Sequence, residues 1–378
     1  MKVLHVSPAF FPATHWGGPI HSLYGLCNAL AAVDGIDLRV LTTDTAGPDL
    51  SQRVEVRSRP EVYPPGYGVY FTERKFGPSF APGLFRALPE MIRWADVVHL
   101  TAVYSSPTLP TLAMARALRR PVVWSPRGSL QRWSGTRNLA VKKVWEIAAR
   151  SLLDPARTIL HCTSAEEARD SAARMRGIAT TVIPNGVELP AAAVRESDPA
   201  APLRVLYLGR LDPIKALDHL VSAVAVVPGQ LVEVTLAGAG EPQFERQLKQ
   251  LVADKALGDR IRFLGHVEGP AKEKLFREHD VLVLPSHREN FGMVVVEALS
   301  RGMPVIASHG TPWAAVEEQR CGFWVPNDPA SLAEALVRMR ATDRAAMGSA
   351  GRSWMAQDFS WGAIAQRMRE TYRSLLSG

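Results

Sequence analysis

Short apolar runs alternate with longer amphipathic segments along the whole chain. An apolar run bounded by turn residues predicts a buried strand, whereas apolar residues recurring at helical spacing predict a helix packed on one face. In the first half, strands are expected at Lys2–Val6, Asp37–Thr42, Val97–Leu100, Val122–Ser125, Thr158–His161 and Thr181–Ile183. Helices are expected between them, at His21–Ala32, Thr108–Arg119, Lys142–Ser151 and Ala165–Arg174. Such alternation favours a parallel sheet covered by helices.

The second half repeats the pattern. Its predicted strands are Arg204–Leu208, Val232–Ala237, Ile261–Phe263, Val281–Leu284 and Pro304–Ala307. Its predicted helices are Ala216–Val226, Pro242–Ala256, Glu273–Glu278, Met293–Arg301 and Ser331–Arg340, with a last helix at Trp361–Leu376. The repetition predicts an α/β protein of two Rossmann-like, doubly wound domains that face each other across a cleft.

The boundary between these domains is expected where the composition changes. Residues 188–203 are rich in Pro and Ala and follow the turn signal Asn185-Gly186, as in a linker. We therefore expect a first domain at 1–187 and a second at 204–357. The C-terminal helix, at about 358–378, is free to pack back on the first domain.

The bulk composition is that of a globular protein, with 47% hydrophobic and 21% charged residues among 378. The cysteines are scattered singly, without metal-ligand spacing, which disfavours a disulfide framework or a zinc site. The chain starts with a strand-like segment, Met1–Val6, that lacks the apolar core of a signal peptide. No apolar run is long enough to span a membrane, and a cytoplasmic location is expected.

The formal net charge of +7 is concentrated in one segment. Between Arg116 and Arg150 the chain holds nine Lys or Arg and a single acid, Glu146, together with Trp124, Trp133 and Trp145. The segment is interpreted either as a solvated helical face or as a patch that meets anionic lipid or a phosphorylated acceptor. The latter would put the protein on the inner face of the cell membrane. No recognised nucleic-acid-binding motif accompanies the charge, so nucleic acid is not expected as a partner.

The loop after the first strand contains the pair Gly17-Gly18 directly before the first helix. Glycines at this position allow backbone N–H groups to approach a bulky anion. A G-x-G-x-x-G sequence does not follow the first strand, which disfavours a simple NAD-binding domain.

A second candidate site follows the first strand of the second domain. Gly209-Arg210 ends that strand, and Lys215 follows at the start of a helix. Two cations at the carboxyl edge of a sheet can neutralise a diphosphate. Two glycine-rich strand ends, Leu236–Glu241 and Phe263–Val267, bring open backbone to the same edge, and together these features suggest a nucleotide pocket.

The segment Ser286–Leu299 carries two glutamates, Glu289 and Glu297, on either side of a predicted strand-to-helix turn. If both lay on one helix, they would be about 12 Å apart along its axis and about 80° apart around it. Glycosidase acid/base pairs lie about 5–9.5 Å apart, which disfavours that interpretation. Two hydroxyl-binding carboxylates on one elongated ligand fit better, and the amides of Phe291, Gly292 and Met293 could donate to phosphate or sugar oxygens between them.

With these motifs, the chain resembles the retaining glycosyltransferases of the GT-B fold, family 4 (group 1), of the bacterial polysaccharide-assembly type. The resemblance covers essentially the whole length. It rests on the number, order and spacing of motifs that are weak singly: Gly17-Gly18, Ile183-Pro-Asn-Gly-Val187, Leu208-Gly-Arg-Leu-Asp-Pro-Ile-Lys215, Leu236-Ala-Gly-Ala-Gly240, Gly265-His-Val267, and Glu289 with Glu297.

The resemblance implies roles for the matching positions. Arg210 and Lys215 would hold the donor diphosphate and stabilise it as a leaving group. Glu297 would bind the ribose hydroxyls, and Glu289 would contact the transferred sugar.

Other matching positions would complete the nucleotide-sugar site. Gly17 and Gly18 would close over the diphosphate from the first domain, and the loop at His266 and Val267 would lie against the base. The glycine-rich strand ends, with Gly209 and Gly238, would line the nucleotide pocket.

The family often places a histidine near the sugar, and His99, at the end of a predicted strand, is the candidate here. Arg127 stands where relatives commonly have a histidine. The segment Gly310–Trp313 also departs from the usual family pattern, and its tryptophan is expected to shape the sugar or acceptor pocket.

The function implied is transfer of a hexose from a nucleoside-diphosphate sugar, UDP- or GDP-linked, to an acceptor hydroxyl with retention of anomeric configuration. A metal or other cofactor is not expected, because the chain has no Asp-x-Asp element. The acceptor would be a lipid-linked or other glycan in exopolysaccharide, capsule or lipopolysaccharide assembly. Two alternatives remain: a nucleotide-sugar 2-epimerase of the same architecture, and a non-catalytic protein that binds a membrane surface or a polyanion.

Overall fold

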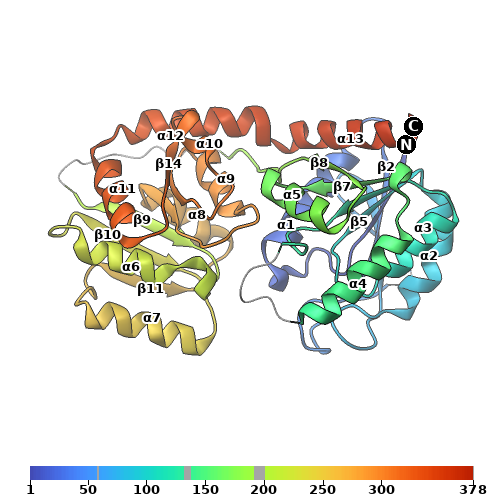
Figure 1. The fold of residues 1–378 in the computed structure, drawn as a ribbon, viewed down its shortest axis with the longest axis horizontal. Helices are drawn as coiled ribbons and strands as arrows, with labels where there is room; N and C mark the ends of the chain where they lie inside the picture. Colours follow the sequence, from blue (N-terminus) through green and yellow to red (C-terminus); the bar gives the residue numbers. More distant parts are fainter. Residues whose placement is uncertain (58, 132–137, 191–200, 378) are drawn as a thin grey trace. The chain divides into compact units, whose positions relative to one another are not determined.

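The computed structural model describes the chain except residues 58, 132–137, 191–200 and 378. The chain forms two compact units, shown in Figure 1. Unit 1 comprises Met1–Gly186 and Trp361–Gly378, and unit 2 comprises Val187–Ser360. Each unit has its own sheet and its own hydrophobic core.

Unit 1 is built on an eight-stranded sheet of order β3-β4-β2-β1-β5-β6-β7-β8. All neighbouring strands are parallel except β3 and β4. The strands are β1 (Lys2–Val6), β2 (Asp37–Thr43), β3 (Glu61–Tyr63), β4 (Tyr67–Thr72), β5 (Val97–Thr101), β6 (Val122–Ser125), β7 (Thr158–Cys162) and β8 (Ala179–Val182). The chain builds the sheet outward from β1, then returns to β5 on the other side, so that the strand order reverses between β1 and β5.

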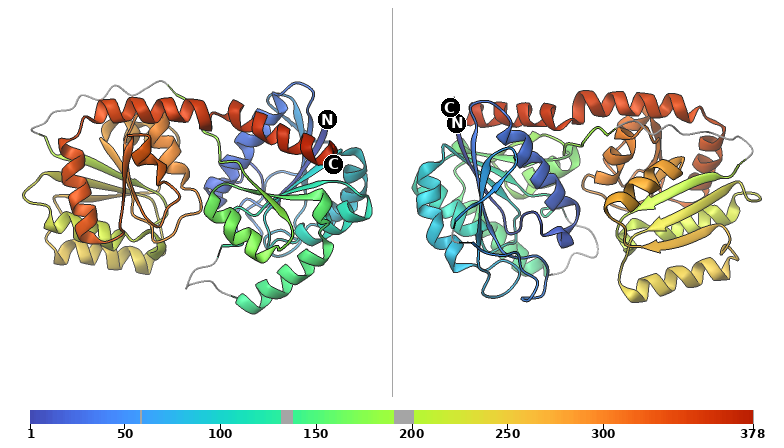
Figure 2. Two further views of the ribbon diagram at one scale, coloured as in Figure 1. Left: turned by 45° about the horizontal axis from the view of Figure 1, so that its top comes forward. Right: turned by 180° about the vertical axis from the view of Figure 1, so that it is seen from behind.

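The helices of unit 1 cover both faces of this sheet (Figure 2). They are α1 (Gly18–Ala31), α2 (Pro82–Trp94), α3 (Thr108–Ala117), α4 (Leu139–Leu152), α5 (Ala165–Arg174) and α13 (Trp361–Ser377). The last of these packs along α1, and its Met368 and Tyr372 are fully buried in the core that α1 also fills. Trp361 fits directly against Gly25 and Gly186, where an added Cβ would lie 2.2 and 2.3 Å from the indole. The end of the chain is therefore an integral part of unit 1.

Unit 2 has a six-stranded parallel sheet of order β11-β10-β9-β12-β13-β14. Its strands are β9 (Leu203–Leu208), β10 (Val232–Ala237), β11 (Ile261–Gly265), β12 (Val281–Leu284), β13 (Val305–Ser308) and β14 (Gly322–Val325). Its helices are α6 (Leu217–Val226), α7 (Pro242–Asp254), α8 (Gly269–Glu278), α9 (Met293–Ser300), α10 (Ala315–Glu318), α11 (Pro329–Ala341) and α12 (Arg344–Trp354). Successive residues of a strand point to opposite faces, so Tyr207 joins the core under α6 and α11, while Leu206 joins the core under α9.

The predicted α/β architecture of two parallel-sheet units is confirmed, and the strands predicted in both halves are present with shifts of one or two residues. Six of the strands and α-helices described were missed: β3, β4, α2, α10, β14 and α12. Local sequence explains several of these misses. Pro89 lies inside α2, and glycines lie within β4 and at the start of β14. Proline has a low helix propensity and glycine a low strand propensity, so the local sequence does not indicate these elements, which tertiary packing stabilises.

Two further findings bear on the sequence-based expectations. Within the described residues, no helix is both long and apolar enough to cross a bilayer. Cys27, Cys162 and Cys321 are free and buried, and burial raises the pKa of the Cys162 and Cys321 thiols to about 12.

Candidate active site

In unit 2 the strand order reverses between β9 and β12, which are hydrogen-bonded neighbours. The helices that follow these two strands, α6 and α9, pack against opposite faces of the sheet. Open α/β sheets bind their ligands at this kind of position. The loops concerned are residues 209–216 after β9 and 285–292 after β12.

The loop after β9 is fixed by internal hydrogen bonds. The Tyr207 hydroxyl, on a fully buried ring, donates to the Arg210 carbonyl at 2.7 Å. The Asp212 carboxylate accepts from the Ile214 amide at 3.0 Å and caps the turn that ends with Lys215. The Arg210 side chain is 71% exposed, and its Nε lies 3.9 Å from the Asp212 carboxylate. The guanidinium is thus available to solvent at the edge of the site.

The loop after β12 is supported by Gly310 and Trp313, the ends of the segment that departs from the usual family pattern. The Glu289 amide donates to the Gly310 carbonyl at 2.8 Å. A Cβ on Gly310 would lie 2.3 Å from the carbonyl oxygens of both Ser286 and His287, so only glycine fits there. The Trp313 indole N–H donates to the Phe291 carbonyl at 2.5 Å, and its ring packs edge-on against Phe291.

Trp313 is only 3% exposed and belongs to the core beneath α9. Trp313 therefore supports the turn from the core, and its part in shaping a sugar or acceptor pocket stays a prediction. The two loops are also tied to each other, because the His287 amide donates to the Ile214 carbonyl at 2.8 Å.

Lys215 and Glu289, which are 74 positions apart in sequence, meet at this edge of the sheet as an ion pair between Nζ and Oε2. Their side chains are 15% and 16% exposed, respectively, so the pair is largely shielded from water without being sealed off. Two residues proposed separately from sequence are thus in direct contact.

Glu297 forms a second carboxylate–lysine pair nearby in the sequence. Its Oε1 lies 2.7 Å from Nζ of Lys272, a residue of α8 that was not predicted to belong to the site. The two side chains are 22% and 28% exposed. Glu297 lies on α9, whereas Glu289 precedes that helix, so the two glutamates do not share a helix.

The amides predicted to bind oxygens lie at the N-terminus of α9. Gly292 is its N-cap, with a positive φ of 80° that disfavours other residues. The Phe291 ring is 5% exposed and packs in the core, so this residue would offer its backbone only. Among the described residues, nothing accepts a hydrogen bond from the amides of Phe291, Gly292 and Met293. A helix N-terminus with open amides favours negative charge.

The glycine-rich strand ends have a structural explanation of their own. The Gly209 amide donates to Ala237, and the Gly238 amide donates to Gly265 at 2.7 Å. A Cβ on Gly238 would lie 1.8 Å from the Gly209 carbonyl oxygen, so Gly238 is required for this close backbone approach.

The loop that follows β11 is more open. His266 has a 68% exposed side chain, paired with Glu268 at 2.9 Å. Val267 packs at the margin of the core beneath α9.

In unit 1, Gly17 and Gly18 lie at the start of α1, directly after the loop that follows β1. Gly17 has a φ of 69°, and no atom lies within 4 Å of the Cβ position, so its backbone borders open space. The Thr43 hydroxyl donates to the Pro8 carbonyl at 2.6 Å and fixes the start of the loop. This is the carboxyl edge next to the strand reversal between β1 and β5.

The predicted catalytic histidine, His99, lies inside the core of unit 1 with no exposed surface. Its Nδ1 is 2.6 Å from the Tyr372 hydroxyl of α13, and its Nε2 is 2.7 Å from the Ser125 hydroxyl. The ring stacks on that of His5 at 4.3 Å between centroids, and burial lowers its pKa well below the ordinary value. Both ring nitrogens are engaged in holding β5, β6 and α13 together. Arg127, in the same region, is partly buried, and its guanidinium donates to the Asn185 side-chain oxygen.

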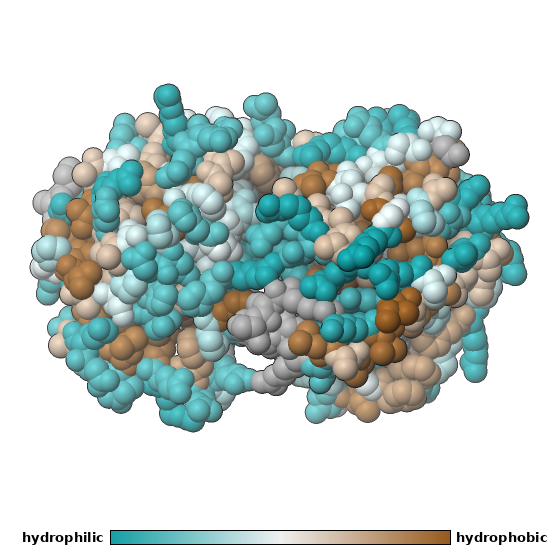
Figure 3. Space-filling model, viewed as in Figure 1, coloured by the Kyte–Doolittle hydropathy of each residue, from teal (hydrophilic) through white to brown (hydrophobic). Residues whose placement is uncertain are grey.

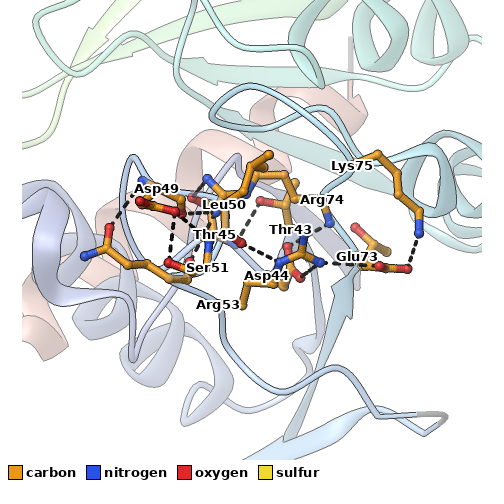
Figure 4. A network of polar contacts seen from close by, with 12 residues as sticks. Thr43, Asp44, Thr45, Asp49, Leu50, Ser51, Arg53, Glu73, Arg74 and Lys75 are labelled. Atoms are coloured by element: carbon orange, nitrogen blue, oxygen red, sulfur yellow. Dashed lines mark hydrogen bonds and ion pairs between the residues drawn. The ribbon is translucent and has the colours of Figure 1, made fainter.

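A second polar network at the carboxyl edge of unit 1 was not predicted from sequence (Figure 4). Arg74, which follows β4, is fully buried, and its Nη1 donates to the Thr45 hydroxyl at 3.0 Å and the Gly47 carbonyl at 2.9 Å. Its Nη2 donates to the Asp49 carbonyl at 2.6 Å. The Asp44 carboxylate accepts from the Arg74 amide at 2.8 Å. One arginine therefore connects several residues of the loop after β2 by hydrogen bonds.

No group of three or more His, Cys, Asp or Glu suited to a metal ion occurs among the residues the structure describes. The groups placed at the strand reversal of unit 2 and on α9 are cations, carboxylates and backbone amides.

Two family models match successive parts of the chain. The model "Glycosyltransferase Family 4" matches residues 16–190, and the model "Glycosyl transferases group 1" matches residues 202–341. The curated relatives include D-inositol 3-phosphate glycosyltransferases. That of Saccharomonospora viridis is 33% identical over 47% of this chain and 44% of its own length, and that of Streptomyces scabiei is 34% identical over 49% and 44%. The matched region thus spans less than half the length of these relatives.

Solved structures resemble the whole chain. Sucrose-phosphate synthase from Thermosynechococcus elongatus has a TM-score of 0.73 at 23% identity, over 100% of this chain and 99% of the other. HepE of Anabaena in complex with UDP has a TM-score of 0.76 at 20% identity, over 99% and 100%. Its complex with UDP-glucose has a TM-score of 0.72 at 22% identity, over 99% and 100%.

The two Rossmann-like units and these neighbours identify the fold as GT-B, as predicted. By sequence, the chain belongs with the group 1 and family 4 glycosyltransferases.

Proposed function

We propose that this protein is a glycosyltransferase that moves a hexose from a nucleoside-diphosphate sugar to an acceptor hydroxyl with retention of configuration. The observation that carries the proposal is the Lys215–Glu289 ion pair at the strand reversal of unit 2. It puts a cation suited to a diphosphate beside a carboxylate suited to sugar hydroxyls, at the edge where such sheets bind ligands.

The leaving diphosphate is the main electrostatic demand of this reaction. Arg210 would act as an exposed bidentate fork, and Lys215 as a largely shielded point charge. Preorganised positive charge where negative charge develops typically contributes about 3–4 kcal/mol per group to the transition state. The α9 amides would add donors without requiring a metal.

Lys215 can pair either with Glu289 or with a bound diphosphate. Without donor, the lysine neutralises the glutamate. A bound diphosphate would compete for Lys215 and release the Glu289 carboxylate to accept hydrogen bonds from the hydroxyls of the transferred sugar. Glu297, held by Lys272, would accept from the ribose hydroxyls. Gly17 and Gly18 would offer open backbone to a phosphate at the edge of unit 1.

UDP-sugars are the first donors to test, since HepE of Anabaena was solved with UDP and with UDP-glucose. GDP-sugars remain in the test set. For the acceptor we propose a lipid-linked or other glycan of bacterial surface-polysaccharide assembly, with the protein in the cytoplasm, at the inner face of the membrane. The D-inositol 3-phosphate glycosyltransferases make a phosphorylated polyol a second acceptor to include.

Thermal-shift screening against nucleoside diphosphates and their sugars would identify the donor, because a ligand that binds the folded state raises the melting temperature. Turnover would then be followed with and without acceptors. Lys215→Ala is expected to weaken donor binding, whereas Lys255→Ala, on an exposed part of unit 2, should retain it. Conversion of free donor to an epimer without acceptor would instead indicate a 2-epimerase, and absence of any nucleotide binding would overturn both assignments.

A further inference from the structure

Helix α4 of unit 1 exposes large apolar side chains. Val141, Val144 and Ile147 are 66%, 67% and 57% exposed, and Leu139, at the start of the helix, is 45% exposed. Apolar side chains of this size are normally buried in a protein core, and a helix face in contact with water is normally polar. Because residues three and four apart lie on the same side of a helix, Val144 and Ile147 form one continuous apolar band.

The opposite side of α4 is attached to the unit. Ala149 is fully buried, and the helix packs against α3. The Trp145 indole donates to the Val103 carbonyl at 2.8 Å. The helix is therefore anchored on one face and apolar on the other.

Cations border the apolar band. A surface hollow of about 300 Å³ is lined by Ile147 of the band, by Lys143 and Arg150 of α4, and by Arg174 and Arg176 at the end of α5 and just after it, with Ala173 and Glu146. Figure 3 shows hydrophobic and strongly hydrophilic side chains next to each other over the part of unit 1 where Figure 1 draws α4.

Glu146, the acidic residue that lines the hollow, does not neutralise these cations at the surface. Glu146 is buried, and its carboxylate accepts a hydrogen bond from the Tyr104 hydroxyl at 2.5 Å. Its other oxygen lies 4.0 Å from the Arg174 guanidinium, which also donates to the Leu130 carbonyl. The exposed side of the hollow is therefore cationic.

We propose that α4 is an interfacial helix that docks unit 1 on an anionic lipid bilayer. Val141, Val144 and Ile147 would enter the boundary between headgroups and acyl chains. Lys143, Arg150 and the neighbouring arginines would bind lipid phosphates. Helices with an apolar face bordered by Lys and Arg bind membranes in this way, by apolar burial together with attraction to anionic lipid.

A second copy of the chain fits this surface less well. A twofold contact through α4 would bring the same patch of each protomer together, and the cations at its border would face their own copies. Like charges that lose water in an interface oppose association. An anionic bilayer satisfies both the apolar band and its cationic border.

The first test is flotation of the full chain with vesicles of phosphatidylglycerol and phosphatidylcholine, or of phosphatidylcholine alone. Binding is expected to the anionic vesicles and to fall steeply with salt. The double variant V144S/I147S is expected to lose at least about tenfold in partition coefficient. It lacks two apolar side chains that the bilayer would bury. Val226→Ser in unit 2, at a position 64% exposed, is the matched control and should bind as wild type.

A second test reports where the helix lies. Because the three native thiols are buried, Val144→Cys would be labelled selectively with an environment-sensitive fluorophore. Anionic vesicles should shift its emission to shorter wavelength, whereas inorganic phosphate should not.

Three outcomes would overturn the proposal: wild-type protein that ignores anionic vesicles at low salt, a double variant that binds like wild type, or an emission shift that follows protein concentration without lipid. The last would indicate a self-association surface. Donor-induced thermal shifts depend on unit 2 and should be the same in all variants, so failure of the docking proposal is distinguishable from failure of the transferase proposal.

Discussion

Lys215 ends a short turn after β9, Glu289 follows β12, and their side chains form an ion pair where the strand order of unit 2 reverses. The neighbouring strands bring together two loops, one held by the Tyr207 hydroxyl and the other by the Gly310 carbonyl. The His287 amide, which donates to the Ile214 carbonyl, also joins the two loops directly. The pair is therefore preorganised, which is the condition for electrostatic catalysis.

Replacing Lys215 by Ala should lower kcat by about 10²–10³-fold, since one preorganised charge at the leaving group is lost. Circular dichroism and melting temperature should change little, because the side chain lies at the edge of the core. Steady-state kinetics with the identified donor measure the effect, and Lys255→Ala serves as the control. Activity within threefold of wild type would remove Lys215 from the leaving-group role.

Glu289→Gln should reduce kcat more than it reduces affinity for the nucleoside diphosphate, because that product lacks the sugar. Glu318→Gln, on the exposed side of α10, is the comparison. Should Glu289→Gln weaken nucleotide binding and spare turnover, the roles of the two glutamates would have to be exchanged.

Glu297→Gln should weaken binding of a ribonucleoside diphosphate by about tenfold, in line with loss of about 1.5 kcal/mol for a hydrogen bond to a charged group. The same substitution should leave binding of the 2′-deoxy analogue nearly unchanged. Lys272→Ala should act in the same direction, because Lys272 holds that carboxylate. Lys274→Ala, on the same helix and 66% exposed, should have no effect in calorimetric titrations. Equal losses for both nucleotides would exclude a ribose contact.

Gly310→Ala should destabilise unit 2 and displace the turn that carries Glu289. The added Cβ would meet two backbone carbonyl oxygens at 2.3 Å, a clash that side-chain rotation cannot relieve. We expect a loss of about 1–3 kcal/mol in urea unfolding, together with reduced kcat. Gly258→Ala, which faces open space, is the control. Wild-type stability of Gly310→Ala would show that the loop is not braced in this way.

Stability should decline in acid because of buried histidines in unit 1. Burial lowers the pKa of His5 and His161 from 6.5 to about 3, with Arg127 acting in the same direction. Below pH 6.5 the unfolded chain then binds more protons than the folded one. The contribution of each histidine is fully present above pH 6.5 and is lost at about 1.4 kcal/mol per pH unit as the pH falls toward 3.

Urea unfolding at several pH values between 7.5 and 4.5 would measure this decline. His161→Gln should flatten it, whereas His21→Gln, at an exposed position, should not. Stability independent of pH across this range would contradict the burial of neutral histidines.

The residues at strand ends were predictable, and those that support them were not. A strand followed by Gly-Arg, or by Pro and a helix start, marks the carboxyl edge of a sheet, and this located Arg210, Lys215 and Glu289. Lys272 and Arg74 depend on partners distant in sequence, to which no local pattern points.

His99 shows that local sequence also does not tell whether a residue at a strand end is exposed or buried. A histidine at a strand end has the same local sequence whether it faces a ligand or, as here, a tyrosine from a helix 273 positions later. Burial by an element from the far end of the chain cannot be derived from periodicity.

That far-end element has a consequence for biosynthesis. Unit 1 closes its core with α13, including the fully buried Met368 and Tyr372, whereas unit 2 is made of one uninterrupted segment. During translation, unit 2 can therefore complete its fold while unit 1, begun earlier, still lacks the helix that covers Leu23 and Leu26. On a ribosome the order of completion is the reverse of the order of synthesis, and a chain truncated before Trp361 would release a finished unit 2 joined to an unfinished unit 1.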